Sequence, residues 1–251
     1  MNDPSNDFLA ASNSHKGYWT HLDEIENVRR HHGDFDAGED GMDKSINRPF
    51  RNGASILAHV HARVAAAKKS VQICSPYADF TDAEIAFIKE LAARGVKVEI
   101  LSNSIMTSDN MPAQVIVDKR VGPAFKGIAN ITVFEFGKID AVTLGGTVPY
   151  GKLHAKFVVV DGEWVFDGTW NGDPRSRNLN SETFQKIRSI GLGQDFNDFF
   201  DFLTAQSHIF DSPEYYAIRT NPKLGKMKLE IAAHQGTLQQ IFNFLGVTWL
   251  L

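Results

Sequence analysis

A histidine and a lysine two positions apart, His154 and Lys156, are the residues of this 251-residue chain best suited to chemistry. Side chains alternate between the two faces of a strand, so a strand over 152–160 would point both groups the same way. The residues of its other face are all apolar. Phosphate suits such a pair, because lysine donates to its oxygens while imidazole attacks phosphorus or carries a proton. The alternative interpretation is a solvated strand edge without a catalytic role.

The spacing beyond this pair makes the chemical interpretation specific. The pattern His-x-Lys-x4-Asp-x6-Gly-Thr-x-Asn is filled at six fixed positions, His154, Lys156, Asp161, Gly168, Thr169 and Asn171, and Glu182 follows in Asn-Ser-Glu. This pattern resembles the HKD motif of the phospholipase D superfamily. Together with Ser75-Pro76-Tyr77 and Leu101-Ser102-Asn103-Ser104, it is most similar to the C-terminal lobe of the cardiolipin synthase-like, phosphatidyl-transferring branch, over about residues 54–205.

The resemblance implies a role for each motif residue. His154 would be the nucleophile or the general acid of a reaction through a phosphohistidine. Lys156 and Asn171 would bind the substrate phosphate, with Thr169 in support.

Two carboxylates complete the implied site. Glu182 would hydrogen-bond the far ring nitrogen of His154 and fix its tautomer. Asp161, at a turn, is better suited to anchoring the structure than to carrying a proton. Trp170 and Gly172 depart from the smaller residue and the leucine typical of the branch, so the substrate pocket is not specified by the resemblance.

The chain contains one such motif, whereas the superfamily joins two across a near-symmetric interface. The resemblance therefore implies a second HKD lobe, supplied by homodimerisation or by another chain. It implies a phospholipid substrate, no cofactor and no metal. Two alternatives stay open: a dimeric, metal-independent nuclease or phosphodiesterase, and a non-catalytic orphan lobe. The net charge of −4 makes nucleic acid the less favoured substrate, without excluding it.

The elements that must position these residues follow from periodicity and turn signals, and predict an α/β fold. We expect a mixed, mostly parallel sheet with helices on both faces, as one phospholipase D lobe. A capping box at Thr81 and Glu84 predicts a helix that stops at Gly95, and Asp161-Gly162 predicts a type I′ hairpin turn. The other expected helices cover 56–68, 110–126 and 196–207, and the other expected strands cover 71–75, 96–101, 131–136 and 187–192.

The two ends of the chain differ from this regular part. Residues 1–50 are polar and acidic, a composition that predicts a connector between lobes or a disordered segment. The pattern over residues 18–30 is compatible with a short helix. Residues 51–251 would form the catalytic lobe, ending in a helical extension that is either buried or in contact with a membrane surface. The start of the sequence resembles no secretory signal, and the single cysteine, Cys74, fits a reducing compartment. We therefore expect a cytoplasmic protein, or one bound peripherally at the inner face of the membrane.

Overall fold

The computed structural model describes residues 34–39, 54–108, 110–137, 152–173, 175–176 and 182–220. This part of the chain is built on one eight-stranded sheet in the order β1-β7-β6-β5-β2-β3-β4-β8. The helix predicted over 18–30 and the C-terminal helical extension lie outside the described residues. The division of the chain at residue 50 stays a prediction, although β1 lies before that boundary and pairs with β7.

The strands and helices have the following bounds. The strands are β1 (Asp34–Glu39), β2 (Ser70–Cys74), β3 (Lys97–Asn103), β4 (Ile131–Phe136), β5 (Phe157–Val160), β6 (Trp164–Gly168), β7 (Thr183–Arg188) and β8 (Ser207–Ile209). The helices are α3 (Ala54–Ala65), α4 (Asp82–Ala93), α5 (Met111–Ile116), the π-helical segment η2 (Val117–Val121), α6 (Gly122–Phe125), α9 (Ile190–Thr204) and α10 (Pro213–Thr220).

The sheet is mixed, as expected, but parallel pairing is confined to β2, β3 and β4. The other five pairings are antiparallel, so the prediction of a mostly parallel sheet was wrong in that respect. The physical reason is the connections. A helix returns the chain for a parallel strand, whereas the tight turn between β5 and β6 permits only an antiparallel neighbour. In that turn Asp161 and Gly162 both have positive φ, 56° and 72°, which confirms the type I′ prediction.

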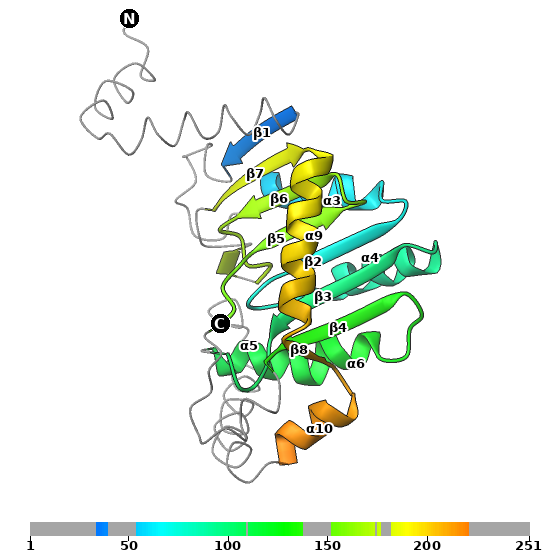
Figure 1. Ribbon diagram of the computed structural model, residues 1–251, viewed down its shortest axis with the longest axis vertical. Helices are drawn as coiled ribbons and strands as arrows, with labels where there is room; N and C mark the ends of the chain where they lie inside the picture. The colour runs from blue at the N-terminus through cyan, green and yellow to red at the C-terminus, as the bar shows by residue number, and fades with distance from the viewer. Residues whose placement is uncertain are drawn as a thin grey trace, which may run out of the picture.

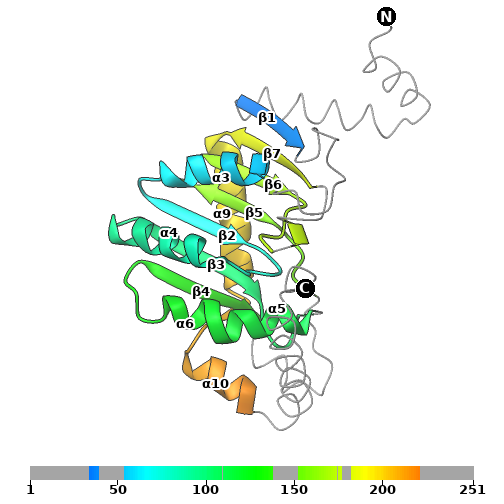
Figure 2. The same cartoon turned by 180° about the vertical axis from the view of Figure 1, so that it is seen from behind.

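Helices cover both faces of the sheet, as predicted (Figures 1 and 2). On the face shown in Figure 1, α9 crosses the strands and buries Phe200 and Leu203 against Phe157 and Val159. On the face shown in Figure 2, α3, α4 and α6 pack on the sheet around a larger apolar cluster. The strand β5 therefore contributes alternate residues to two cores, which is why all four of its residues are buried.

The capping box of α4 is confirmed at its atoms. The Thr81 backbone N–H donates to Glu84 Oε2 at 2.6 Å, and the Glu84 backbone N–H donates to Thr81 Oγ1 at 3.2 Å. Gly95 has a φ of 88° and ends the helix, as its sequence position predicts. The helix predicted over 110–126 is instead three helical segments, with η2 between α5 and α6.

The boundary between β7 and α9 differs from the prediction. A strand was expected over 187–192, but β7 ends at Arg188 and α9 begins at Ile190. Ser189 caps the helix, since its hydroxyl accepts from the Leu192 backbone N–H at 3.2 Å. The alternation of apolar residues and glycines after Ser189 imitates a strand. Its glycines serve packing, because a Cβ on Gly193 would lie 2.1 Å from the Gly162 carbonyl oxygen.

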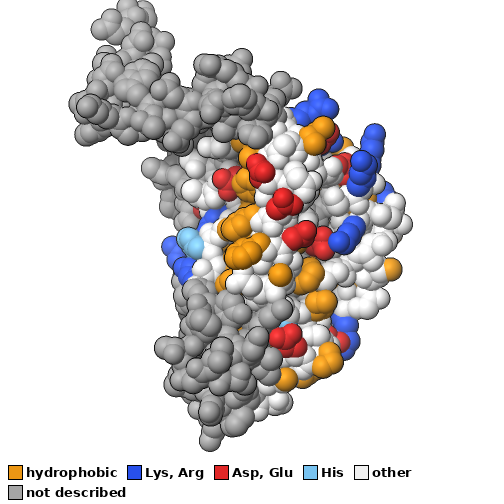
Figure 3. Space-filling view, viewed as in Figure 1, with side chains coloured by type: hydrophobic (Ala, Val, Ile, Leu, Met, Phe, Trp, Pro, Cys, Tyr) orange, Lys and Arg blue, Asp and Glu red, His pale blue; other side chains and the backbone are white. Residues whose placement is uncertain are grey.

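The outer face of α9 is not uniformly polar. Phe199 and Phe202 are 44% and 61% exposed, and Figure 3 shows hydrophobic and acidic side chains together along the face that α9 covers. Within the described residues, every helix is too short or too polar to cross a bilayer.

Candidate active site

The site lies where β2 and β3 end, and a buried amide positions its first residues. Asn103, the last residue of β3, donates from Nδ2 to the Pro76 carbonyl oxygen at 3.2 Å and to the Leu153 carbonyl oxygen at 3.0 Å. Its Oδ1 accepts from the Leu153 backbone N–H at 3.0 Å. The side chain therefore pairs with Leu153 as a neighbouring strand would, and holds the chain at the residue before His154.

His154 and Lys156 precede β5, which begins at Phe157 rather than at 152 as expected. His154 is exposed and Lys156 is half-buried. The Lys156 ammonium donates to the His154 carbonyl oxygen at 2.6 Å. Burial, and then the charge of Lys152, lower the pKa of Lys156 from its usual value. An anion beside the Lys156 ammonium would favour its charged form and so offset the effects of burial and of Lys152. A bound phosphate would be such an anion.

Glycine at position 168 brings the next motif residues against β7. A Cβ on Gly168 would lie 2.1 Å from the Thr183 carbonyl oxygen and 2.7 Å from Phe184 Cα, so a larger residue would push the strands apart. The Gly168 backbone N–H donates to the Lys156 carbonyl oxygen at 3.3 Å. The motif thus needs glycine here for close approach of two strands.

The Thr169 hydroxyl joins the motif to Glu182. It donates to Glu182 Oε2 and accepts from the Thr183 backbone N–H at 3.0 Å. A hydroxyl has one hydrogen to donate. In this geometry the Thr169 hydroxyl donates it to Glu182, so it is not available to donate to a substrate phosphate. Glu182 is buried, with 4% of its surface exposed, and its predicted hydrogen bond to His154 stays a prediction.

Asn171 is fixed through its backbone. Its carbonyl oxygen accepts from the Ser75 hydroxyl at 2.5 Å, and its N–H donates to Ser176 Oγ at 3.3 Å. Ser176 is in turn held by Asp173, whose Oδ1 accepts from the Ser176 backbone N–H at 2.7 Å. The amide side chain is thereby placed on a rigid backbone beside Lys156, and both residues line the same pocket.

That pocket opens on the α3 side of the sheet and contains about 440 Å³ of empty space, partly open to solvent. Its walls are mainly apolar, and its polar residues are Lys156, Asn171, Ser75 and Asp167. Burial raises the pKa of the Asp167 carboxyl. Burial also raises the pKa of the nearby Cys74 thiol to about 12, so this thiol stays protonated and is a poor nucleophile.

Asp161 lies at the other end of β5 from the site. Its carboxylate accepts from the backbone N–H groups of Lys68, Lys69 and Ser70 at 2.7–3.1 Å. The four residues of β5 lie between it and Lys156, so the two are five residue steps apart, about 16 Å along the chain. A phosphate bound by Lys156 is therefore out of its reach, and the carboxylate joins the hairpin to the start of β2.

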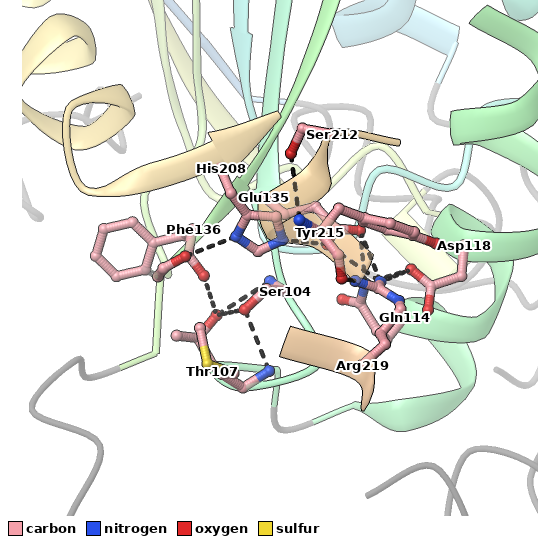
Figure 4. A network of polar contacts seen from close by, with 12 residues as sticks. Ser104, Thr107, Gln114, Asp118, Glu135, Phe136, His208, Ser212, Tyr215 and Arg219 are labelled. Atoms are coloured by element: carbon pink, nitrogen blue, oxygen red, sulfur yellow. Dashed lines mark hydrogen bonds and ion pairs between the residues drawn. The ribbon is translucent and has the colours of Figure 1, made fainter. Parts of the chain in front are cut away.

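No sequence pattern predicted a role for Asn103 or Ser75, although Asn103 ends β3 and Ser75 directly follows β2. A second set of buried polar residues, here named the Glu135 cluster, lies at the β4–β8 edge and was not predicted from the sequence (Figure 4). Its members are Gln114, Asp118, Glu135, His208 and Arg219. The available signal was the single glutamate in the apolar strand Ile-Thr-Val-Phe-Glu-Phe, since a buried carboxylate requires a partner.

The Glu135 cluster pairs its charges internally. Glu135 Oε2 lies 2.9 Å from His208 Nε2 and 3.1 Å from Arg219 Nη2, and the same Arg219 nitrogen donates to Asp118 Oδ1 at 2.6 Å. His208 Nδ1 lies 2.7 Å from the Gly137 carbonyl oxygen, an acceptor, so this nitrogen carries a hydrogen. The cluster ties α10 to the sheet and to η2.

Comparisons with known proteins agree with this fold. The solved structure of Nuc from Salmonella typhimurium, a phospholipase D family member, has a TM-score of 0.52 at 16% identity, covering 71% of this chain and all of that one. Phosphatidylserine synthase from Haemophilus influenzae has a TM-score of 0.57 at 16% identity, covering 80% of this chain and 45% of that one. At these identities the likeness shows the fold alone.

Sequence comparisons identify the family. Cardiolipin synthase C of Escherichia coli is 31% identical over 128 residues, 49% of this chain and 27% of that protein. Cardiolipin synthase of Geobacillus thermodenitrificans is 28% identical over 147 residues, 58% of this chain and 26% of that protein. The matched region thus spans about a quarter of these relatives. A family model described as cardiolipin synthase, PLD-like domain, matches residues 60–203, more than half of the chain. The chain therefore belongs to the phospholipase D superfamily, in the family of cardiolipin synthase phospholipase D-like domains.

Proposed function

We propose that this chain is one catalytic lobe of a phospholipase D-type phosphodiesterase or phosphatidyltransferase that acts on phospholipid. The observation that carries the proposal is that the motif residues from Lys156 to Asn171, apart from Asp161, meet at one edge of the sheet. Lys156 and Asn171 line one pocket, and Gly168 and Thr169 join them to buried Glu182. The full motif on this fold, within this family, supports phosphodiester chemistry over a binding role.

The reaction would proceed in two displacements at phosphorus, with the His154 imidazole as the nucleophile of the first and the leaving group of the second. An imidazole nitrogen attacks phosphorus, a P–N bond forms, and the P–O bond to the departing alcohol breaks. Water or an acceptor alcohol then attacks the phosphohistidine and releases the imidazole. Lys156 would neutralise a non-bridging oxygen and the Asn171 amide would donate to another. Thr169 would hold Glu182 in place, and Glu182 would orient the His154 ring.

The departing alcohol needs a proton donor, and we assign that donor to a second lobe. Three other histidines lie within the described residues: His59 and His61 are in α3, where His61 stacks on Phe87 of α4, and His208 is buried in the Glu135 cluster. We propose that a second copy of this chain, or a partner lobe, supplies the second histidine across a twofold or pseudo-twofold interface. Because the substrate resides in a bilayer, the assembled enzyme would act at a membrane surface.

The test is turnover of phosphatidylglycerol vesicles by the assembled protein, with His154→Ala beside the matched variant His61→Ala. We expect His154→Ala to abolish turnover and His61→Ala to retain it. Wild-type protein quenched in denaturant at neutral or mildly alkaline pH should contain an acid-labile phosphatidyl adduct that mass spectrometry assigns to His154.

Two results would contradict the proposal. One is unchanged turnover in His154→Ala. The other is cleavage of a plasmid without added metal and without lipid turnover, which would establish the nuclease alternative. A monomer on size-exclusion chromatography that neither turns over lipid nor cleaves DNA would exclude the homodimeric form of the enzyme.

A further inference from the structure

Two buried polar atoms beside the candidate site have no hydrogen-bond partner among the described residues. They are the indole nitrogen Nε1 of Trp170 and the side-chain oxygen Oδ1 of Asn171. Buried polar groups in folded proteins are almost always paired, so each exception needs an explanation, such as a ligand or an ordered water. The two residues are adjacent in sequence and line the same pocket as Lys156.

The Trp170 ring is held in place by its surroundings. It packs against the apolar cluster beneath α3 and α4, and a Cβ on Gly172 would lie 3.7 Å from ring atom Cη2. Gly172 has a φ of 71°, a backbone conformation that favours glycine. The ring is therefore fixed as one wall of the pocket, and its N–H cannot easily turn to reach another acceptor.

The chemistry of the two atoms is complementary. An indole N–H only donates, whereas an amide oxygen only accepts. A hydroxyl group accepts one hydrogen bond and donates another, so it has the chemistry that both atoms require. A phosphate oxygen would satisfy only the indole, and an alkyl chain would satisfy neither.

We propose that Trp170 and Asn171 recognise a hydroxyl group on the alcohol portion of the phosphodiester, while Lys156 binds its phosphate. This rests on the proposed function and adds a specificity-determining residue, Trp170, to the site. Head groups with a free hydroxyl one to three carbons from the phosphate would be preferred over unsubstituted alkyl esters. The preference would arise from the unpaired N–H, not from the hydrophobic area of the ring.

Isothermal titration calorimetry of the full chain with two matched probes tests this inference. The probes are sn-glycerol 3-phosphate and n-propyl phosphate, which share a three-carbon chain and differ in their hydroxyl groups. We expect wild type to bind glycerol phosphate about tenfold more tightly than propyl phosphate. A tenfold ratio is the affinity gain expected when a ligand makes about one additional neutral hydrogen bond. Trp170→Phe retains an aromatic ring and lacks the N–H, so its affinity ratio should approach one while propyl phosphate binds as before.

Trp164→Phe is the matched control. Its indole N–H already donates to Glu163 Oε1 at 2.8 Å, outside the pocket, so the affinity ratio should stay at the wild-type value. A Trp170→Phe ratio equal to that of wild type would overturn the inference, and so would a wild-type ratio of one. The proposed function fails separately if neither probe binds, or if Lys156→Ala binds both as wild type does; either result also removes the basis of the inference.

Discussion

The candidate site and the Glu135 cluster are both polar groups on one sheet, but they differ in how their hydrogen bonds are satisfied. In the Glu135 cluster, the carboxylate is fully buried and contacts His208, Arg219 and Gln114. At the candidate site, Lys156 donates to the His154 carbonyl oxygen, and two neighbouring polar atoms have no partner in the part of the chain that the structure describes. A closed network stabilises a fold, whereas an open set of donors and acceptors beside a pocket can bind a ligand.

The comparison gives opposite expectations for mutations in the two regions. A substitution at the open site should lower activity and leave stability almost unchanged. A substitution in the closed cluster should lower stability and leave the turnover of each folded molecule unchanged.

The largest expected effect is on turnover, from Lys156→Ala. Removing the ammonium that would neutralise a phosphate oxygen should lower kcat by about 10²–10³-fold, as for loss of one preorganised donor. The free energy of unfolding in urea should not fall, because burial already disfavours the charged form of this lysine. Lys97→Ala, which removes an exposed lysine paired with Glu99 on β3, is the matched control and should leave both quantities near wild type. A stability loss in Lys156→Ala as large as the activity loss would break the comparison.

The next effect is on stability, from Glu135→Ala. This change leaves Arg219 without one of its two carboxylates and His208 without its carboxylate, so we expect a loss of about 3–5 kcal/mol in the free energy of unfolding. Glu99→Ala removes a carboxylate whose lysine partner is exposed, and should cost about 1 kcal/mol or less. Urea titrations followed by circular dichroism measure both. Equal losses in the two variants would show that the cluster contributes no more than a surface ion pair.

Asp161→Ala tests whether this motif residue contributes to stability or to catalysis. The variant removes an acceptor shared by three backbone N–H groups, so we expect a loss of about 1–3 kcal/mol in the free energy of unfolding. The turnover number of the folded protein should stay within a few-fold of wild type. Asp161→Asn tolerates the positive φ and keeps one acceptor oxygen, so it should cost less. A selective fall in kcat at wild-type stability would return Asp161 to the catalytic machinery.

The site was more predictable from sequence than the sheet around it. Motif residues 154–171 carry their geometry locally, in a hairpin whose Asp-Gly turn fixes the register. Their approach to Glu182 depends on Gly168, which the motif also contains. The role of Asn103 was not predictable, because it depends on Leu153 lying beside the end of β3, fifty positions away in sequence.

The error at the boundary between β7 and α9 comes from an ambiguous pattern. Short apolar runs are ambiguous between strand and helix, and the run after Ser189 belongs to a helix because Gly193 allows α9 to pack on the β5–β6 turn. The Glu135 cluster joins residues from β4, β8, α10, η2 and α5. No local pattern predicts such a set, and only the lone glutamate of β4 indicated that a partner was required.

The smallest expected effect is a change in pH dependence, from Asp118→Asn. Burial and the neighbouring Glu135 carboxylate raise the pKa of Asp118 from its usual value to about 7. Between about pH 4 and pH 7 the folded protein therefore holds more protons at this residue than the unfolded chain, so its contribution to stability declines as pH rises. Asparagine removes that decline, and the variant should gain stability relative to wild type from pH 5 to pH 8.

Asp82→Asn is the control, because it removes an exposed carboxylate paired with Arg120, and it should show no such trend. Parallel pH profiles for Asp118→Asn and wild type, in urea titrations at four pH values, would mean that Arg219 alone sets the charge of Asp118. The contribution of the Glu135 cluster to the free energy of unfolding would then be independent of pH between pH 5 and pH 8.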